Sequence, residues 1–289
     1  MARRSRHVSP NPFSRNAMAL QSLLDFDALI APIPGENPAG QRDISGVRTE
    51  IDELRKEIDP SSYAANDPRK PENAKKADWP GIIDLSIQTL ETASKDYLIA
   101  MRLTEALVKV NGFAGLRDGL HLLRLLTDEC WDRMHPEITE EDDIDTRARR
   151  FDWLDNIDRG AWFPSSLRLV PMMPPSETGY GWQHWKETQA GKASKITPAD
   201  IEKAIQLTTR EACEIQVEEL NQCSQELDGL VQSLPVKMQG ETKNHAPGLM
   251  GIRGALNDCR MLGQQILQKK GGGTKPAAPS PVAEAAPGE

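Results

Sequence analysis

The residues best suited to chemistry include an acidic run near the middle of the chain. Glu140, Glu141, Asp142, Asp143 and Asp145 supply the carboxylate oxygens that calcium and magnesium bind. An EF-hand loop, however, alternates its oxygen ligands around a central glycine, and this run has neither feature. We therefore interpret the run as a solvated loop whose acids precede a helix, where the helix dipole favours negative charge. The sequence predicts no metal site and no cofactor site.

Two pairs of residues have the types found in catalytic arrangements. Cys130 and His135 combine a thiol with a base, but five residues turn them about 140° apart on a helix. Ser94 and Lys95 have the types of a serine–lysine nucleophile, but adjacent residues diverge on a helix. Together with Asp96 they fit a turn between helices better, with Ser94 or Asp96 as the cap and Lys95 in solvent. We therefore expect a protein that is not an enzyme.

A loop rich in proline and glycine follows the first helical segment. It contains Pro34, Gly35, Glu36, Asn37 and Pro38. The loop has too many prolines for a phosphate-binding loop and lacks the Gly-Lys-Ser/Thr signature. One interpretation is a rigid turn with a structural role only. The other is a docking loop for a partner protein, because an exposed rigid loop loses little entropy on binding.

Three tryptophans lie around a segment rich in proline and glycine. They are Trp162, Trp182 and Trp185. Tryptophan is enriched at the energetic centres of protein interfaces, which makes these residues candidates for partner docking. The alternative is local packing of the segment onto the rest of the protein, because a tryptophan usually finds burial within its own chain.

Composition limits the classes of protein to which the chain can belong. Of its 289 residues, 38% are hydrophobic and 27% are charged, which indicates a folded chain with a real core. The formal net charge of −8 leaves no basic surplus for nucleic acid, and no apolar run approaches the length of a membrane span.

The four cysteines fall in predicted helices without a Cys-x-x-Cys pair. They fit buried free thiols in a reducing cytoplasm, where we expect the protein to reside.

Hydrophobic periodicity predicts an all-α protein. Asp78 begins one helix, Asn111-Gly112 ends another, and short connections imply antiparallel neighbours in a bundle. The segment Ser166–Val170 is the one candidate for an isolated strand. Apolar positions from Cys213 and from Leu249 recur at steps of three and four, which predicts a long helical hairpin that closes within one chain or between two.

The sequence predicts five divisions of the chain. They are a disordered basic tail at 1–18, a helical domain at 19–160, an irregular Pro/Gly-rich connector at 161–196, the helical hairpin at 197–270, and a disordered Gly/Pro/Ala linker or tail at 271–289.

Four stretches together resemble the ImpA N-terminal domain of TssA proteins, over about residues 20–160. They are Ile33–Gly40 (IPGENPAG); Asp78-Trp79-Pro80; Ser94-Lys95-Asp96 with Leu103–Leu107 (LTEAL) and Gly112–Leu116 (GFAGL); and Trp131, His135-Pro136, Asp142-Asp143, Asp145 and Arg147. The order and spacing of these stretches make the resemblance specific, although each stretch alone is weak. The later helices resemble the middle region of the family with less specificity.

The resemblance implies a scaffold that helps to assemble the bacterial type VI secretion system. Implied partners are proteins of the baseplate, of the tail tube and sheath, or of the membrane complex, and a homo-oligomer is left open. Longer family members carry a C-terminal ring-forming domain, whereas this sequence reaches a linker-like tail at that point, and Met18 is an alternative start. Two other functions are considered: an unrelated helical adaptor or dimerisation protein, and a hydrolase that uses a histidine such as His121, His135 or His184.

Overall fold

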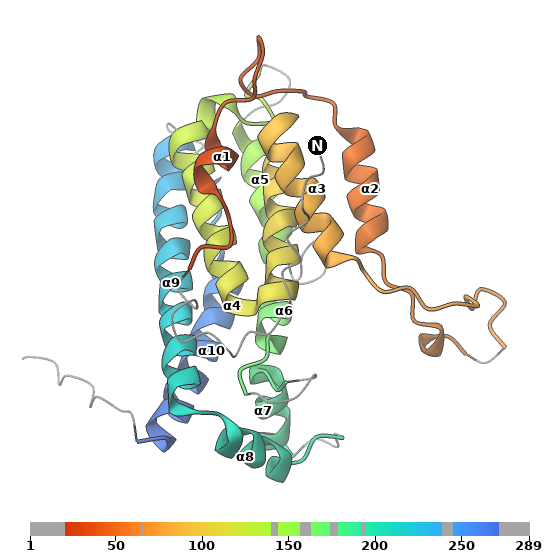
Figure 1. Cartoon of the computed structure of the whole chain (residues 1–289), viewed down its shortest axis with the longest axis vertical. Coiled ribbons are helices and arrows are strands. Elements are labelled where there is room, and N and C mark those ends of the chain that lie inside the picture. Colours follow the sequence, from red (N-terminus) through yellow and green to blue (C-terminus); the bar gives the residue numbers. More distant parts are fainter. Residues whose placement is uncertain are drawn as a thin grey trace, which may run out of the picture.

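The computed structural model describes residues 21–64, 66–139, 144–156, 163–173, 179–191, 195–238 and 245–271. Within these ranges the chain forms ten α-helices and two short 3₁₀ helices and no β-strand, so the predicted all-α fold is confirmed. Figure 1 shows the long helices in an elongated bundle, with α9 running along α4. The predicted tail at 1–18 and residues 272–289 lie outside the described ranges.

The first helices begin where the sequence supplies a cap. α1 (Phe26–Ile30) begins after Asp25, whose side chain accepts a hydrogen bond from the Ala28 N–H. α2 (Ser45–Arg55) directs Ile51 into the core, and η1 (Pro60–Ser62) follows in a long connection. α3 (Trp79–Thr92) begins after Asp78, whose carboxylate accepts from the Gly81 N–H, as the sequence predicts.

α4 (Tyr97–Cys130) consists of two antiparallel helical segments joined by a reversal at Gly112. Gly112 has φ 61° and ψ −131°, a conformation that glycine adopts far more readily than other residues. At the other end of the pair, the Tyr97 hydroxyl donates to Thr127 Oγ1 at 3.2 Å. The break predicted at Asn111-Gly112 and the antiparallel packing of its neighbours are therefore confirmed.

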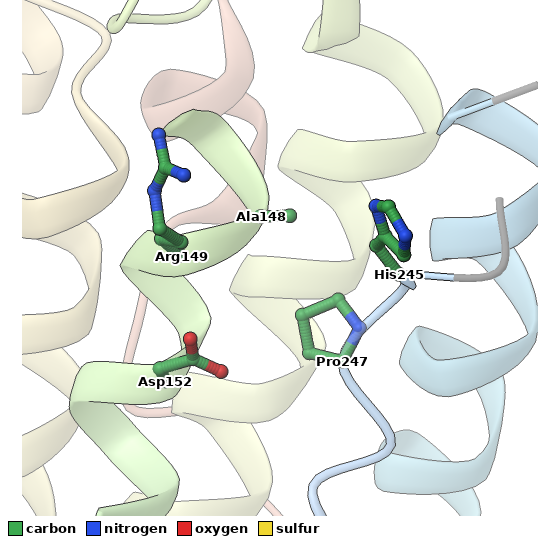
Figure 2. A pocket seen from close by; sticks show the side chains of 5 residues that line it. All are labelled: Ala148, Arg149, Asp152, His245 and Pro247. Atoms are coloured by element: carbon green, nitrogen blue, oxygen red, sulfur yellow. The ribbon is translucent and has the colours of Figure 1, made fainter. Parts of the chain in front are cut away.

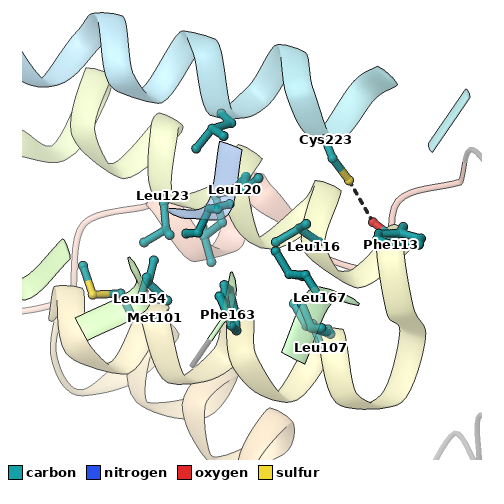
Figure 3. Packing of buried hydrophobic residues seen from close by; sticks show 14 of the residues in the cluster. Met101, Leu107, Phe113, Leu116, Leu120, Leu123, Leu154, Phe163, Leu167 and Cys223 are labelled. Atoms are coloured by element: carbon teal, nitrogen blue, oxygen red, sulfur yellow. Dashed lines mark hydrogen bonds between the residues drawn. The ribbon is translucent and has the colours of Figure 1, made fainter. Parts of the chain in front are cut away.

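Two glycines allow the two halves of α4 to pack closely. A Cβ atom at Gly115 would overlap the backbone carbonyl of Leu107, and one at Gly119 would overlap the side chain of Thr104. Figure 3 shows the apolar layer that results, with Leu107 from one half beside Leu116 from the other. The glycines thus replace side-chain bulk with direct contact between the helices.

The middle of the chain is more helical than predicted. η2 (Trp131–Arg133) is followed by α5 (Ile144–Asp155), α6 (Phe163–Leu169) and α7 (Trp182–Gln189). The isolated strand predicted at 166–170 is wrong, because most of these residues lie in α6. Phe163 and Leu167, one turn apart, are fully buried, whereas Leu169 is 48% exposed, so burial follows a helical period. The connector predicted as irregular at 161–196 therefore contains two short helices.

The C-terminal helices pack back onto earlier parts of the chain. α8 (Pro198–Leu207) begins with Thr197 as its cap, and α9 (Arg210–Met238) and α10 (Met250–Lys269) follow. α9 contacts both α4 and α10, so the helical hairpin closes within one chain. Asp155 of α5 caps α10 by accepting from the Gly251 and Ile252 N–H groups. The predicted apolar rows are buried, with Leu220, Cys223, Leu227, Leu230 and Leu234 on α9 and Ile252, Leu256, Cys259, Leu262 and Ile266 on α10.

All four cysteines are free and buried, as predicted. The Cys223 thiol donates to the carbonyl oxygen of Phe113 at 3.2 Å, across the contact between α9 and α4 that Figure 3 shows. Burial raises the pKa of Cys259 to about 12 and that of Cys223 well above its ordinary value. These thiols therefore stay protonated and pack as small apolar side chains.

Glu219 on α9 makes the stability of the bundle depend on pH. Burial raises the pKa of its carboxyl from 4.5 to about 7, and nearby Arg117 only partly offsets this effect. Because the folded state holds this proton more tightly than the unfolded chain does, the contribution of Glu219 to the free energy of unfolding falls as the pH rises from 4.5 to 7.

We expect the substitution Glu219→Gln to remove this decline and to stabilise the protein at pH 8 by up to about 3 kcal/mol. Urea unfolding at pH 5, 6, 7 and 8 measures the effect. The exposed neighbour Glu218, substituted to glutamine, serves as the control and should leave the pH profile unchanged. Parallel pH profiles for the wild type and Glu219→Gln would show that the carboxyl is solvated.

Candidate docking site

The predicted docking loop is exposed but internally fixed. Residues 34–38 are all exposed, whereas Ile33 and Ala39 on either side are buried. The Ile33 N–H donates to the Pro38 carbonyl at 3.0 Å and closes the loop. Asn37 holds it from inside, since its Oδ1 accepts from the Ala39 N–H at 2.9 Å and its Nδ2 donates to the Gly40 carbonyl at 3.0 Å.

The end of the loop is joined to the turn between α3 and α4. The Gln41 N–H donates to the Ala93 carbonyl and the Lys95 N–H donates to the Ala39 carbonyl, both at 2.8 Å. Gly40 has φ 77°, and a Cβ atom there would overlap the Ala93 carbonyl oxygen. Glycine is therefore required at this position both by the backbone conformation and by the close approach of the two segments.

Lys95 lies beneath the loop and is fully buried, so the prediction that it is solvated is wrong. Its ammonium donates to the carbonyl of Leu29 at 2.5 Å and to that of Leu90 at 2.6 Å. Each carbonyl belongs to the last turns of a helix, where carbonyl groups lack partners within the helix. Lys95 therefore caps α1 and α3 together, and burial lowers the pKa of its ammonium to about 8.

The same turn is connected to the segment that follows α4. Asp96 caps α4, as predicted, by accepting from the Leu98 and Ile99 N–H groups, and it forms an ion pair with Arg48 of α2 at 2.7 Å. The His135 N–H donates to the Lys95 carbonyl at 2.6 Å, and the Tyr97 N–H donates to the His135 carbonyl at 3.1 Å. The turn thus lies between the loop on one side and His135 on the other.

Arg147 of α5 holds the segment around His135 from the far side. Its guanidinium donates to the carbonyls of Trp131, Met134 and Pro136 at distances from 2.5 to 3.0 Å. The guanidinium also lies 4.7 Å from the ring centroid of Trp131. Arg147 is 1% exposed, so this buried cation is stabilised by carbonyl oxygens and aromatic faces in place of water.

These contacts bring together stretches that are far apart in the sequence. The loop, the turn from Ser94 to Asp96, the segment His135-Pro136, and Arg147 lie in one hydrogen-bonded network at one end of the bundle. The network is made mainly of backbone contacts, and the loop is its most exposed part. The arrangement presents a fixed ridge of five exposed residues, Pro34 to Pro38. The importance of Lys95 and Arg147 for this ridge was not apparent from the residues alone, because their partners are carbonyl groups.

The tryptophans named as docking candidates lie elsewhere. Trp182 and Trp185 on α7 pack partly against the core, and the cationic groups of Arg168 and Lys186 lie 5.3 and 5.8 Å from the ring centroid of Trp182. Figure 1 places α7 at the opposite end of the bundle from the connection between α1 and α2. Trp162 lies outside the described residues, as do residues 140–143 of the acidic run. A docking role for the tryptophans stays a prediction.

The pockets found among the described residues are open to solvent. One pocket of about 260 Å³ lies between α5 and the segment before α10, and Figure 2 shows its lining residues. They are Ala148, Arg149, Asp152, His245 and Pro247. A second pocket is lined by His121 and by Glu226 of α9, and Glu226 forms an ion pair with Arg124 at 2.7 Å. Across the described chain, no three His, Cys, Asp or Glu side chains are placed to hold a metal ion.

Known proteins share both the sequence and the fold of this region. Residues 30–156 match the family described as ImpA, N-terminal, type VI secretion system. The type VI secretion system component TssA1 of Pseudomonas aeruginosa is 36% identical over 76 residues, which cover 26% of this chain and 22% of that protein. The chain thus matches only about a fifth of the length of this curated relative.

A solved structure extends the likeness to most of the fold. It is the N-terminal domain, including the conserved ImpA_N region, of the TssA component of the type VI secretion system from Burkholderia cenocepacia. Its TM-score is 0.70 at 23% identity, and the match covers 86% of this chain and 95% of that one. The likeness in fold agrees with the family match to residues 30–156, which contains the whole hydrogen-bonded network. Residues 30–156 are therefore an ImpA N-terminal domain.

Proposed function

We propose that this chain is a non-enzymatic assembly component of a bacterial type VI secretion system. It acts in the cytoplasm by contact with proteins of the baseplate, of the tail tube and sheath, or of the membrane complex. The family match and the relative from Pseudomonas aeruginosa support the choice of system. No helix among the described residues is both long enough and apolar enough to cross a membrane.

The observation that carries the proposal is the exposed ridge from Pro34 to Pro38. A loop with no structural partner would pay a large entropic cost on binding, whereas this loop is already fixed by Asn37 and by the turn beneath it. The side chains of Pro34, Glu36 and Pro38 are exposed and hold none of these bonds. They are therefore free to contact a partner without disturbing the network.

The test is pairwise binding of this purified chain to the type VI secretion sheath, tube, baseplate and membrane-complex proteins of the same bacterium, measured by biolayer interferometry. We expect one of them to bind, and the triple variant Pro34→Ala, Glu36→Ala, Pro38→Ala to bind at least about tenfold more weakly, as for loss of an interface centre. The matched control Glu50→Ala, on the exposed face of α2, should bind like the wild type.

Thermal unfolding of the triple variant should stay close to that of the wild type, because none of the three side chains is buried, and each Pro→Ala change should lower the free energy of unfolding by no more than about 1 kcal/mol. If the triple variant binds as tightly as the wild type, the contact with the partner lies outside the ridge. Failure of every one of these secretion proteins to bind would instead favour the helical adaptor outside the secretion system.

A further inference from the structure

One side of α2 carries charges that pair with charges at the start of α4. Three residues of α2, spaced four and three residues apart, lie on that side, and each forms an ion pair. The pairs are Arg48–Asp96, Asp52–Arg102 and Arg55–Glu105, with N···O distances of 2.7, 2.7 and 2.6 Å. Along α2 the signs run positive, negative, positive, and along the partners they run negative, positive, negative. This order of charges favours one position of α2 along α4.

The ion pairs are buried on the α4 side only. The side chains of α2 that form them are 24–55% exposed, whereas their partners are 1–9% exposed. Apolar burial is limited, since Ile51 is the one buried residue of α2, all of which the structure describes, and Val47 and Leu54 are buried only in part. α3, by comparison, has four buried residues. The attachment of α2 therefore depends on charge more than the attachment of α3 does.

The contact between α2 and α4 also buries donors that have no acceptor. Among the described residues, Nε of Arg48 and both Nε and Nη1 of Arg102 are buried and donate no hydrogen bond. Arg102 lies over the ring of Trp153 in α5, which offers a π face but no acceptor oxygen. Burial lowers the pKa of Arg102, because the charged form is costly to remove from water. Movement of α2 away from α4 would hydrate these donors, which lowers the cost of that movement.

The position of α2 in the fold leaves it room to move. Figure 1 shows α2 on the outer side of α3, followed by a connection that projects away from the bundle. At the base of this connection, Ile58 and Lys75 exchange backbone hydrogen bonds of 2.8 and 2.9 Å. The Lys75 ammonium donates to the carbonyl of Glu53 in α2 at 2.6 Å. α2 and the base of the connection are therefore joined to each other and can move together.

We propose that α2 is a latch held by charge, which opens away from α4 as a unit while α3 and α4 stay folded. In the closed position, the guanidinium groups of Arg55 and Arg102 lie 5.3 and 5.2 Å from the ring centroid of Trp153. Opening separates Arg55 from this ring and uncovers the charged row on α4. Salt promotes opening, because the exposed halves of the ion pairs are screened. The latch involves this chain alone, so it is independent of binding to secretion proteins.

Hydrogen–deuterium exchange of the whole chain, measured on peptides from α2 and α3 relative to their unfolded rates, tests the latch. We expect amides of α2 to exchange at least about tenfold faster than those of α3, because α2 opens alone. Arg55→Met leaves Glu105 buried without its ion pair and should speed exchange of α2 at least about tenfold further, with α3 unchanged. Lys56→Met, at the exposed next residue, is the matched control and should exchange like the wild type. One common rate for α2 and α3, or an equal effect of Arg55→Met on both helices, overturns the proposal.

A double variant separates the effect of charge from that of packing. Arg55→Met combined with Glu105→Met removes both charges and leaves neither partner buried and unpaired. We expect exchange of α2 in the double variant to return to within about threefold of the wild type, a non-additive result. Raising NaCl from about 0.05 M to about 1 M should speed exchange of α2 less in the double variant than in the wild type, because one ion pair is gone. A double variant that exchanges as fast as Arg55→Met, or that keeps the full salt effect, would show that packing and not charge holds α2.

Discussion

Replacing Arg147 with methionine is expected to lower the free energy of unfolding by about 3 kcal/mol. The guanidinium donates hydrogen bonds to the carbonyls of Trp131, Met134 and Pro136, whereas methionine has no donor for any of them. Burial lowers the pKa of Arg147, which shows that its charge is costly to bury, and removing it recovers part of the loss. The unpaired carbonyls nevertheless dominate, because each loses a charge-assisted hydrogen bond in a buried setting.

Urea unfolding at pH 7 measures this change. Arg149→Met is the matched control, since Arg149 is exposed two residues further along α5, and its effect should stay within about 0.5 kcal/mol. Arg147→Lys should recover little of the loss, because an ammonium cannot span the carbonyls that the planar guanidinium reaches. A loss below about 1 kcal/mol for Arg147→Met would mean that the carbonyls find other partners.

Gly115→Ala is expected to destabilise the protein by about 3 kcal/mol. The added methyl group would overlap the Leu107 carbonyl, which is backbone and cannot rotate away. The two halves of α4 must then move apart, and the apolar layer between them loses contact. This cost exceeds the gain of up to about 1 kcal/mol that alanine normally brings to a helix in place of glycine.

Gly46→Ala in α2 provides the matched control. Gly46 is exposed, and a Cβ atom there would have no neighbour within 4 Å. We expect this change to be neutral or to stabilise the protein by up to about 1 kcal/mol. Thermal unfolding of both variants gives the comparison. Equal midpoints for Gly115→Ala and Gly46→Ala would show that the α4 segments separate without cost.

The sequence predicted the features of the fold that depend on neighbouring residues. The cap at Asp78 and the break at Gly112 follow from local backbone chemistry, and the rows on α9 and α10 follow from helical period. Ser166–Val170 was misread as a strand, because only burial of Phe163 and Leu167 in the folded protein decides the state of so short a segment.

The candidate site was predictable only in part. The proline and glycine residues of the loop indicated a rigid turn, and the hydrogen bonds of Asn37 confirm it. The burial of Lys95 was not predictable, because its partner Leu29 lies 66 residues away and offers only a backbone carbonyl. A carbonyl has the same chemistry in every residue, so no side-chain pattern in the sequence marks it as the acceptor for a lysine.

The bond between Asp155 and the start of α10 affects how the chain folds during synthesis. α10 cannot receive its cap from a neighbouring residue, since its acceptor lies 96 residues earlier, in α5. α9 likewise covers a face of α4 that is made long before it. The segment that corresponds to the family match therefore leaves the ribosome while the apolar face of α4 that α9 covers is still exposed. The nascent chain has to stay soluble until α9 emerges and covers that face, so the early half depends on the late half for its final stability.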